Sequence, residues 1–252
     1  MLTLRLIHTN DFHHRLNAEG IARLRAVLSD PEAPPTLYLD AGDAVRAGNV
    51  GVSLGGEPTL RALGGLGCAA MTLGNREFHV SRPVFAKKIA DADFPVLCAN
   101  LRSKSPGGSV PTVPSVVREV GGVRVGVFGL TAPMVTERMS ARHLSDFLFD
   151  EPISVAKKLV AELRESAEVV ILLSHLGIRA DERLAESVEG IDLIVGGHSH
   201  VVLTEPKWVN GTPLVQAGCH ARWYGEVNLT IKSCGALDLT ARLAPLQERT
   251  GK

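Results

Sequence analysis

The chain has 252 residues, of which 45% are hydrophobic and 21% are charged, so it can bury a large core as one domain over residues 1–252. Its 27 basic and 27 acidic residues leave no formal net charge, which disfavours nucleic acid as a partner. No run approaches the roughly 18 uncharged residues of a membrane-spanning helix, so we expect no membrane partner.

The N-terminus and the cysteines both indicate a cellular compartment. The first residues, MLTLRLIHTND, lead straight into a strand pattern without the features of a secretory signal, which predicts a cytoplasmic protein if Met1 is native. Cys68, Cys98, Cys219 and Cys234 lie far apart with no CxxC pair. Their spacing favours free thiols in a reducing compartment over a disulfide scaffold or a thiolate zinc site.

Short β-branched runs alternate with amphipathic helical patterns along the whole chain. Predicted strands cover residues 2–11, 36–43, 69–75, 94–101, 113–120, 123–132, 168–177, 191–200, 213–218, 224–231 and 237–245. Predicted helices cover residues 18–30, 57–67, 83–92, 152–166 and 179–188. Gly121 and Gly122 read as a hairpin turn, and the loop 103–114 has linker composition without marking a domain boundary. This alternation is typical of the α/β class.

Polar residues follow five of the predicted strands, where an α/β sheet usually binds its ligands. They are Asp11 and His13, Asp43, Asn75, His175, and His198 and His200. One Asp or His after a strand is more often a helix cap or a surface group, but five such endings favour a shared site. Oxygen and imidazole donors suit Mn, Zn, Fe or a similar divalent ion, and seven donors exceed the needs of one tetrahedral zinc. The pattern therefore predicts two divalent metal ions that share a carboxylate.

The order of the motifs resembles that of the calcineurin-like metallophosphoesterases, and in particular the branch of 5′-nucleotidases and 2′,3′-cyclic phosphodiesterases. The matching motifs are HTNDFH at 8–13, DAGD at 40–43, GNREF at 74–78, CANL at 98–101, SHLG at 174–177, GGHSH at 196–200, and VQAG followed by YG near 215–225. Each motif is weak alone, whereas their order and their placement at strand ends are specific. The resemblance implies a four-layer α-β-β-α sandwich.

The resemblance also implies a role for each donor. Asp11, His13 and His200 would hold the first ion, and Asn75, His175 and His198 the second, with Asp43 bridging the two. Two ions in such a site clamp a phosphoryl group and activate a bridging water as hydroxide. The implied function is hydrolysis of a phosphomonoester or phosphodiester, with a nucleotide as one possible substrate.

One motif departs from the family pattern GNHEFD, in which the histidine and the final aspartate form a catalytic pair. Here Arg76 and His79 occupy those two positions. Arg76 can bind a phosphate oxygen but cannot give up a proton near neutral pH. His79 could supply the proton if the backbone turns it inward, although a surface histidine is an equally good interpretation. His14 and His220 are further candidates for the neighbourhood of the substrate.

Because the sequence stops soon after these motifs and contains few aromatic residues, we expect no counterpart of the C-terminal domain with which large nucleotidases of this branch stack a nucleobase. An alternative function is that of a metal- and phosphate-binding protein with weak or no catalysis, because the usual pair is replaced. A nuclease would share the metal chemistry but would need basic tracks for a nucleic-acid backbone. The sequence does not predict the substrate, the native metal or the oligomeric state.

Overall fold

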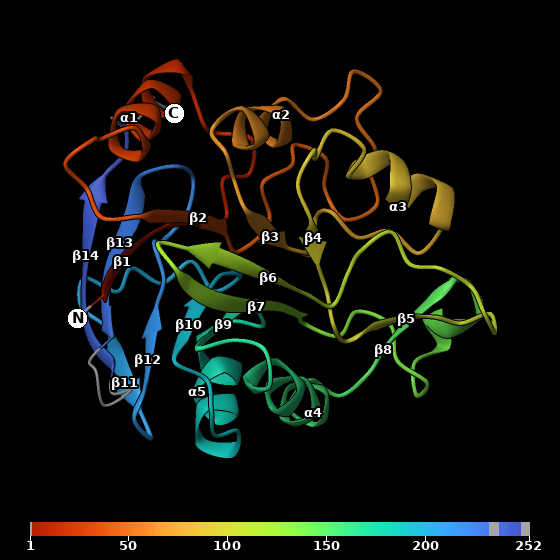
Figure 1. The fold of residues 1–252 in the computed structure, drawn as a ribbon. Helices are drawn as coiled ribbons and strands as arrows, with labels where there is room; N and C mark the ends of the chain where they lie inside the picture. The colour runs from red at the N-terminus through yellow and green to blue at the C-terminus, as the bar shows by residue number, and fades with distance from the viewer. Residues whose placement is uncertain (1, 232–236, 248–252) are drawn as a thin grey trace.

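The computed structural model describes residues 2–231 and 237–247. Two six-stranded sheets lie between two layers of helices (Figure 1). The first sheet has the order β14 (Leu237–Pro245), β13 (Trp223–Ile231), β1 (Leu2–Thr9), β2 (Thr36–Asp40), β3 (Ala70–Thr72) and β4 (Val96–Leu97). The second has the order β11 (Lys207–Val209), β12 (Thr212–Val215), β10 (Leu193–Gly196), β9 (Val169–His175), β7 (Val123–Thr131) and β6 (Ser115–Val120).

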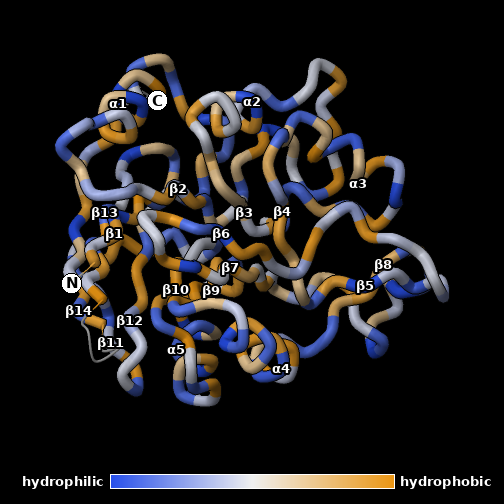
Figure 2. Tube along the Cα trace, viewed as in Figure 1, coloured by the Kyte–Doolittle hydropathy of each residue, from blue (hydrophilic) through white to orange (hydrophobic). Residues whose placement is uncertain are grey.

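The space between the sheets is filled by side chains that alternate along the strands. Leu4 and Leu6 of β1 pack in the same buried cluster as Val125 and Val127 of β7, whereas Ile7 belongs to a cluster on the outer face of the first sheet. Successive side chains of a strand point to opposite faces, so each sheet has two apolar faces to cover. Figure 2 shows the resulting concentration of hydrophobic residues along the central strands.

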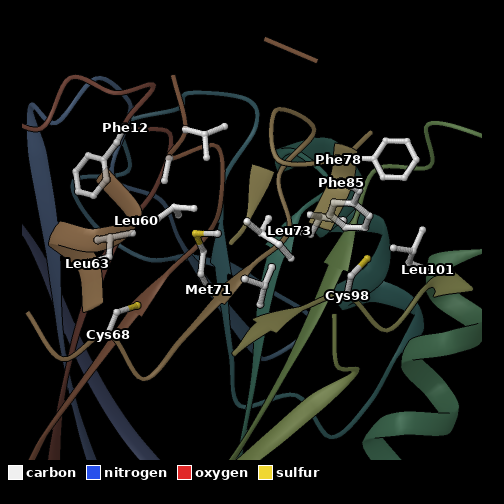
Figure 3. Packing of buried hydrophobic residues seen from close by; sticks show 14 of the residues in the cluster. Phe12, Leu60, Leu63, Cys68, Met71, Leu73, Phe78, Phe85, Cys98 and Leu101 are labelled. Carbon is white, nitrogen blue, oxygen red and sulfur yellow. The ribbon is translucent and has the colours of Figure 1, made fainter. Parts of the chain in front are cut away.

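The helices cover the two outer faces. The helices are α1 (Ala18–Leu28), α2 (Pro58–Gly65), α3 (Arg82–Lys88), α4 (Pro152–Arg164) and α5 (Ile178–Ser187), with a 3-10 turn η1 (Ser140–His143). Leu60 and Leu63 of α2 pack with Met71 of β3 on the first sheet, as Figure 3 shows. Val160 of α4 and Leu184 of α5 pack on the second. The predicted four-layer α-β-β-α sandwich is therefore confirmed.

The parallel strands set the position of the site. Strands β1, β2 and β3 run parallel to one another, as do β7, β9 and β10. The hairpin between β6 and β7 is also confirmed, because Gly121 and Gly122 both have positive φ, of 57° and 81°, as a tight antiparallel turn requires. The loops that follow the parallel strands carry most of the polar motifs of the sequence.

The structure corrects several element boundaries. The segment 94–101, predicted as one strand, divides into β4 and β5 (Leu101–Ser103), and β5 pairs with β8 (Phe147–Phe149). α3 begins at Arg82 and ends at Lys88 rather than covering 83–92. β8 and β11 were not predicted because three residues are too few to establish an alternating pattern.

The prediction of free thiols is confirmed for the three cysteines among the described residues. Cys68 and Cys98 are buried free thiols and Cys219 is a partly buried one. Cys234 lies outside the described residues. In the described ranges, no helix has both the length and the apolar character needed to span a membrane.

Candidate metal centre

The seven predicted donors come together where the carboxyl ends of the two sheets meet. Asp11, Asp43 and Asn75 follow β1, β2 and β3 of the first sheet. His175 is the last residue of β9, and His198 and His200 follow β10 of the second sheet. His13 completes the set from the loop after β1. The spacing along the chain is large, so only the packing of the sheets brings these side chains into one site.

The backbone at this site adopts a conformation that is uncommon outside glycine. Positive φ values occur at Asp11 (52°), His13 (48°), Asp43 (58°), His198 (70°) and His200 (56°). Such values are strained for most side chains and persist only where the surroundings enforce them. Here Asp11 N donates to Gly42 O at 2.8 Å and His13 N to Asp43 O at 2.9 Å, so the first two loops hold each other. This backbone conformation directs the donor side chains toward the site.

A first cluster forms around Asp11. Its Oδ1 atom lies 3.6 Å from His13 Nε2 and 3.3 Å from His200 Nε2, and the two imidazole nitrogens are 3.0 Å apart. Oδ1 is buried without a hydrogen-bond partner, whereas Oδ2 accepts from Asn10 Nδ2 and from His198 N. A buried carboxylate oxygen that faces two imidazoles is a donor set that suits a divalent cation.

A second cluster lies beside it. His175 Nε2 is 3.5 Å from Asp43 Oδ1 and 3.3 Å from Asn75 Oδ1, which in turn is 2.9 Å from His198 Nδ1. The other ring nitrogen of His175 is 2.7 Å from Ala41 O, a contact that orients the ring as in many metal-ligating histidines. Ligand atoms of Asp11, Asp43 and His175 lie within 4.8 Å of one another, so Asp11 reaches both clusters. The bridging role of Asp43 stays a prediction.

The electrostatics of the site also fit bound cations. Although burial opposes ionisation of Asp11, the neighbouring imidazoles of His13 and His200 hold the pKa of this carboxyl below its ordinary value. Burial likewise opposes charge on His175, but the carboxylate of Asp43 raises its pKa to about 9. The nearby carboxylate of Asp11 raises the pKa of His200. A proton on His175 thus offsets part of the negative charge of the buried carboxylates, and a metal ion would displace that proton.

Glu77 holds the loops after β2 and β3 together. Its buried carboxylate accepts hydrogen bonds from the backbone N–H groups of Asp43, Ala44, Val45 and Gly74, at 2.8 to 3.1 Å. Glu77 lies within the motif GNREF, but no role was predicted for it. Its place in a motif, although it is not a predicted ligand, is the signal that could have identified it.

Two asparagines position ligands from outside the clusters. Asn10 donates to Asp11 Oδ2 at 2.7 Å and to Gly218 O at 2.6 Å, which ties the loop after β12 to the first cluster. Asn49 accepts from Asn75 Nδ2 at 2.9 Å, so the amide oxygen of Asn75 faces the histidines. Asn49 belongs to no recognised motif, and sequence reasoning missed it.

Glycine permits a close approach between the two sheets beside the site. A Cβ atom on Gly197 would lie 2.6 Å from Ala41 O and 2.9 Å from His175 Nδ1. Any larger residue would push the loop that carries His198 away from the first sheet. Gly197 therefore lets the two halves of the site meet.

The remaining predicted residues take different positions. Arg76 N donates to Asp43 Oδ1 at 2.8 Å, and its guanidinium, 33% exposed, lies 4.0 Å from Asp43 Oδ2. His79 accepts from Ser81 N at 3.0 Å and lines an apolar cavity. Its described contacts do not include the metal donors, so its role as proton donor stays a prediction.

The two further histidine candidates also separate. The His14 ring contacts Thr59 of α2, with 3.4 Å between Nδ1 and Oγ1, and lies to one side of the clusters. The ring centroid of His220 lies 5.2 Å from that of His13 and 5.9 Å from that of His200. His220 thus lines the first cluster although it is remote in sequence.

The family model of the calcineurin-like phosphoesterases matches residues 4–202, and the chain belongs to this family. A 5′-nucleotidase of Mus musculus is 31% identical over an alignment of 222 positions that covers 79% of this chain and 38% of the relative. The trifunctional nucleotide phosphoesterase protein YfkN of Bacillus subtilis is 27% identical over 98% of this chain and 20% of its own length.

Solved structures agree with the fold. A 5′-nucleotidase precursor from Thermus thermophilus superposes with a TM-score of 0.81 at 28% identity, covering 97% of this chain and 54% of that one. The chain spans about a fifth to about half of the lengths of these three similar proteins. The comparisons therefore concern the part of those proteins that has this fold.

Proposed function

We propose that the protein hydrolyses phosphate monoesters or diesters with two divalent metal ions, and that nucleotides are among its candidate substrates. The observation that carries the proposal is the convergence of seven oxygen and imidazole donors, including the unpartnered Asp11 Oδ1, where the two sheets meet. The names of similar proteins, a 5′-nucleotidase and a nucleotide phosphoesterase, support nucleotides as the first substrates to test.

The chain's own residues would divide the work. One ion would be held by Asp11, His13 and His200, the other by Asn75, His175 and His198, with Asp43 between them. Divalent ions supply Lewis-acid stabilisation of phosphoryl charge and activate water near neutral pH. Neutral amide and imidazole ligands keep the negative charge of the site low, so that an anionic phosphate is not repelled.

Arg76 would bind the phosphate rather than protonate the leaving group. Its guanidinium lies beside Asp43 at the solvent side of the site, where its fork of N–H groups can donate to a phosphate oxygen. Because arginine stays protonated, it cannot act as general acid. We therefore expect a preference for good leaving groups, since general-acid catalysis is worth about 10² to 10⁴ in rate on poor ones.

One observation favours a second candidate function, binding of metal and phosphate with weak or no turnover. His79 Nδ1 accepts a backbone hydrogen bond from Ser81, and its ring borders an apolar cavity instead of the clusters. With Arg76 beside Asp43, the site would then retain phosphate without an efficient proton donor.

A metal-dependent activity panel distinguishes these functions. Metal-free protein would be loaded with Mn²⁺ or Zn²⁺ and tested on p-nitrophenyl phosphate, bis-p-nitrophenyl phosphate, AMP and 2′,3′-cyclic AMP. Hydrolysis that requires added metal and is lost in His200→Ala, a partly exposed ligand, would support the hydrolase. Two bound ions and measurable phosphate binding without turnover of any ester would favour the second function.

A further inference from the structure

A cavity of about 360 Å³ lies next to the metal centre and has no role in the chemistry described above. Its walls are mainly apolar and include Val50, Phe78, Val80 and Val135. Binding sites for small organic groups begin near this volume and have this kind of lining, with a few polar groups that fix orientation.

Asn49 connects the cavity to the metal centre. Its side chain lines the cavity, and its Oδ1 accepts from Asn75 Nδ2 at 2.9 Å. The opposite end of the same Asn75 amide, Oδ1, is 2.9 Å from His198 Nδ1. A group in the cavity that touches Asn49 is therefore one side chain away from a predicted metal ligand.

The inner wall of the cavity is closely packed. Phe78 packs edge-to-face on Phe85, Phe147 and Phe149, with ring centroids 5.6, 6.2 and 5.1 Å apart. Figure 3 shows Phe78 and Phe85 side by side in this cluster. The neighbouring His79 ring is held by the hydrogen bond from Ser81 N. Such a wall is formed before a ligand binds, which lowers the entropic cost of binding.

The outer wall is a loop that is held at defined points. Lys88 of α3, although buried, donates from Nζ to Gly48 O at 2.8 Å, directly before Asn49. Arg46 N donates to Glu57 Oε2 at 2.8 Å, which closes the base of the loop. Val50 is 86% exposed at the rim, so a ligand in the cavity could cover apolar surface that otherwise faces water.

We propose that this cavity is the subsite for an aromatic ring in the alcohol part of the ester substrate. The inference rests on the proposed hydrolase function and narrows its substrate class. Apolar walls and an edge-to-face phenylalanine favour a flat ring over a charged or polyhydroxylated group, and Asn49 and His79 offer polar contacts at its margin. In this view His79 is a specificity residue of the cavity.

Ala141 offers a way to fill the cavity without disturbing the core. It is exposed on η1 and lines the cavity, so Ala141→Trp places an indole in the proposed subsite. Ser140 precedes it in the same turn, is exposed, and is not among the lining residues. Ser140→Trp is therefore the matched control. The values of kcat/KM would be measured for 1-naphthyl phosphate, AMP and glycerol 3-phosphate.

We expect Ala141→Trp to lower kcat/KM at least tenfold for one or both aromatic esters and less than twofold for glycerol 3-phosphate. Ser140→Trp should change none of them by more than twofold. Comparing each variant with the wild type on the same ester cancels differences in leaving-group reactivity. An equal effect of Ala141→Trp on all three esters, or no effect, would overturn the proposal.

A binding measurement separates this inference from the proposed activity. Saturation-transfer NMR with 1-naphthyl phosphate and metal-free protein should show contact from the naphthyl ring in the wild type and Ser140→Trp, and its loss in Ala141→Trp. If the wild type hydrolysed no ester, the proposed function would fail while this result still decided the cavity. Equal ring signals in all three proteins would reject the subsite.

Discussion

The two sheets contribute different chemistry to the site. The loops of the first sheet supply the oxygen donors Asp11, Asp43 and Asn75, whereas the second sheet supplies the imidazoles of His175 and His198, together with that of His200. His13 is the one imidazole from the first sheet. A set of oxygens or a set of imidazoles alone would be an incomplete site. The candidate metal centre is therefore complete only when the two sheets have packed together.

The site loops of the two sheets are also held in different ways. Those of the first sheet follow β2 and β3, and that of the second sheet follows β10. The loops of the first sheet depend on the buried carboxylate of Glu77, which accepts four backbone N–H groups. The loops of the second sheet have no carboxylate that accepts four backbone N–H groups among the described residues; at Ser199 the contacts are neutral, because its Oγ donates to Gln216 Oε1 at 2.9 Å and accepts from Ile178 N at 3.1 Å. Substitutions that remove the contacts of the first sheet's loops should therefore lower stability more than substitutions in the second sheet's loops.

The first prediction compares the loss of a carboxylate shared by both ions, at Asp43, with the loss of an imidazole that serves one ion, at His200. Asp43→Ala should lower the affinity for both ions by more than about 100-fold, because one carboxylate serves two sites and screens the repulsion between the cations. His200→Ala should weaken mainly one ion. Metal content after dialysis, measured by elemental analysis, tests this difference. Two ions retained by Asp43→Ala would contradict the bridging assignment.

Stability should show the same asymmetry. Glu77→Ala leaves four backbone N–H groups without their acceptor, and we expect a loss of at least about 3 kcal/mol in the free energy of unfolding. Ser199→Ala, its counterpart on the second sheet, should cost about 1 kcal/mol. Urea denaturation in the presence of a chelator measures both values. Similar losses of unfolding free energy in the two variants would contradict the proposed difference between the loops of the two sheets.

Arg76, in the loop after β3, can be replaced to test proton donation without removing a predicted metal ligand. Arg76→His should weaken phosphate binding and raise kcat on AMP by about tenfold, with little change on p-nitrophenyl phosphate, because a histidine can protonate a poor leaving group. Arg76→Gln is the control, since it removes the charge without adding an acid.

The double variant Arg76→His with His79→Asp restores the family motif and should increase this gain. If His79 is instead the working acid, His79→Ala should cost about 100-fold on AMP and little on p-nitrophenyl phosphate. A restored motif that stays inactive with both metals bound would favour the phosphate-binding function.

The last prediction concerns a pH dependence that originates inside the first sheet, at His8, which is not a predicted metal ligand. Burial lowers the pKa of His8 in β1 from 6.5 to about 3. The unfolded chain therefore takes up a proton near pH 6.5, whereas the folded protein does so only near pH 3. The free energy of unfolding should fall as the pH decreases through this window, by up to about 1.4 kcal/mol per pH unit.

His8→Asn should flatten the dependence, because asparagine does not titrate. The comparison would use metal-free protein, with unfolding measured at several pH values between about 4 and 7. An unchanged slope in His8→Asn would show that the carboxylates and histidines at the sheet edges dominate the pH dependence.

Much of the architecture could be predicted from the sequence because strands and hairpins have local signals. Alternating side chains mark β1, paired glycines mark the turn before β7, and a polar residue after an apolar run marks a strand end. The seven donors were found by that last rule. These donors could be predicted from their residue types and their positions after strands, without knowing which sheet each strand joins.

Only the tertiary structure decided which of the other polar residues belong to the site. His14 adjoins a predicted ligand in sequence yet contacts α2, whereas His220, far away along the chain, packs on His13. Asn49 reaches Asn75 from a loop without a motif. The direction of a side chain beyond a strand end depends on loop dihedrals such as the positive φ of His13, and those are enforced by contacts between distant segments. A local sequence pattern does not indicate such contacts, because they form only when the two sheets pack together.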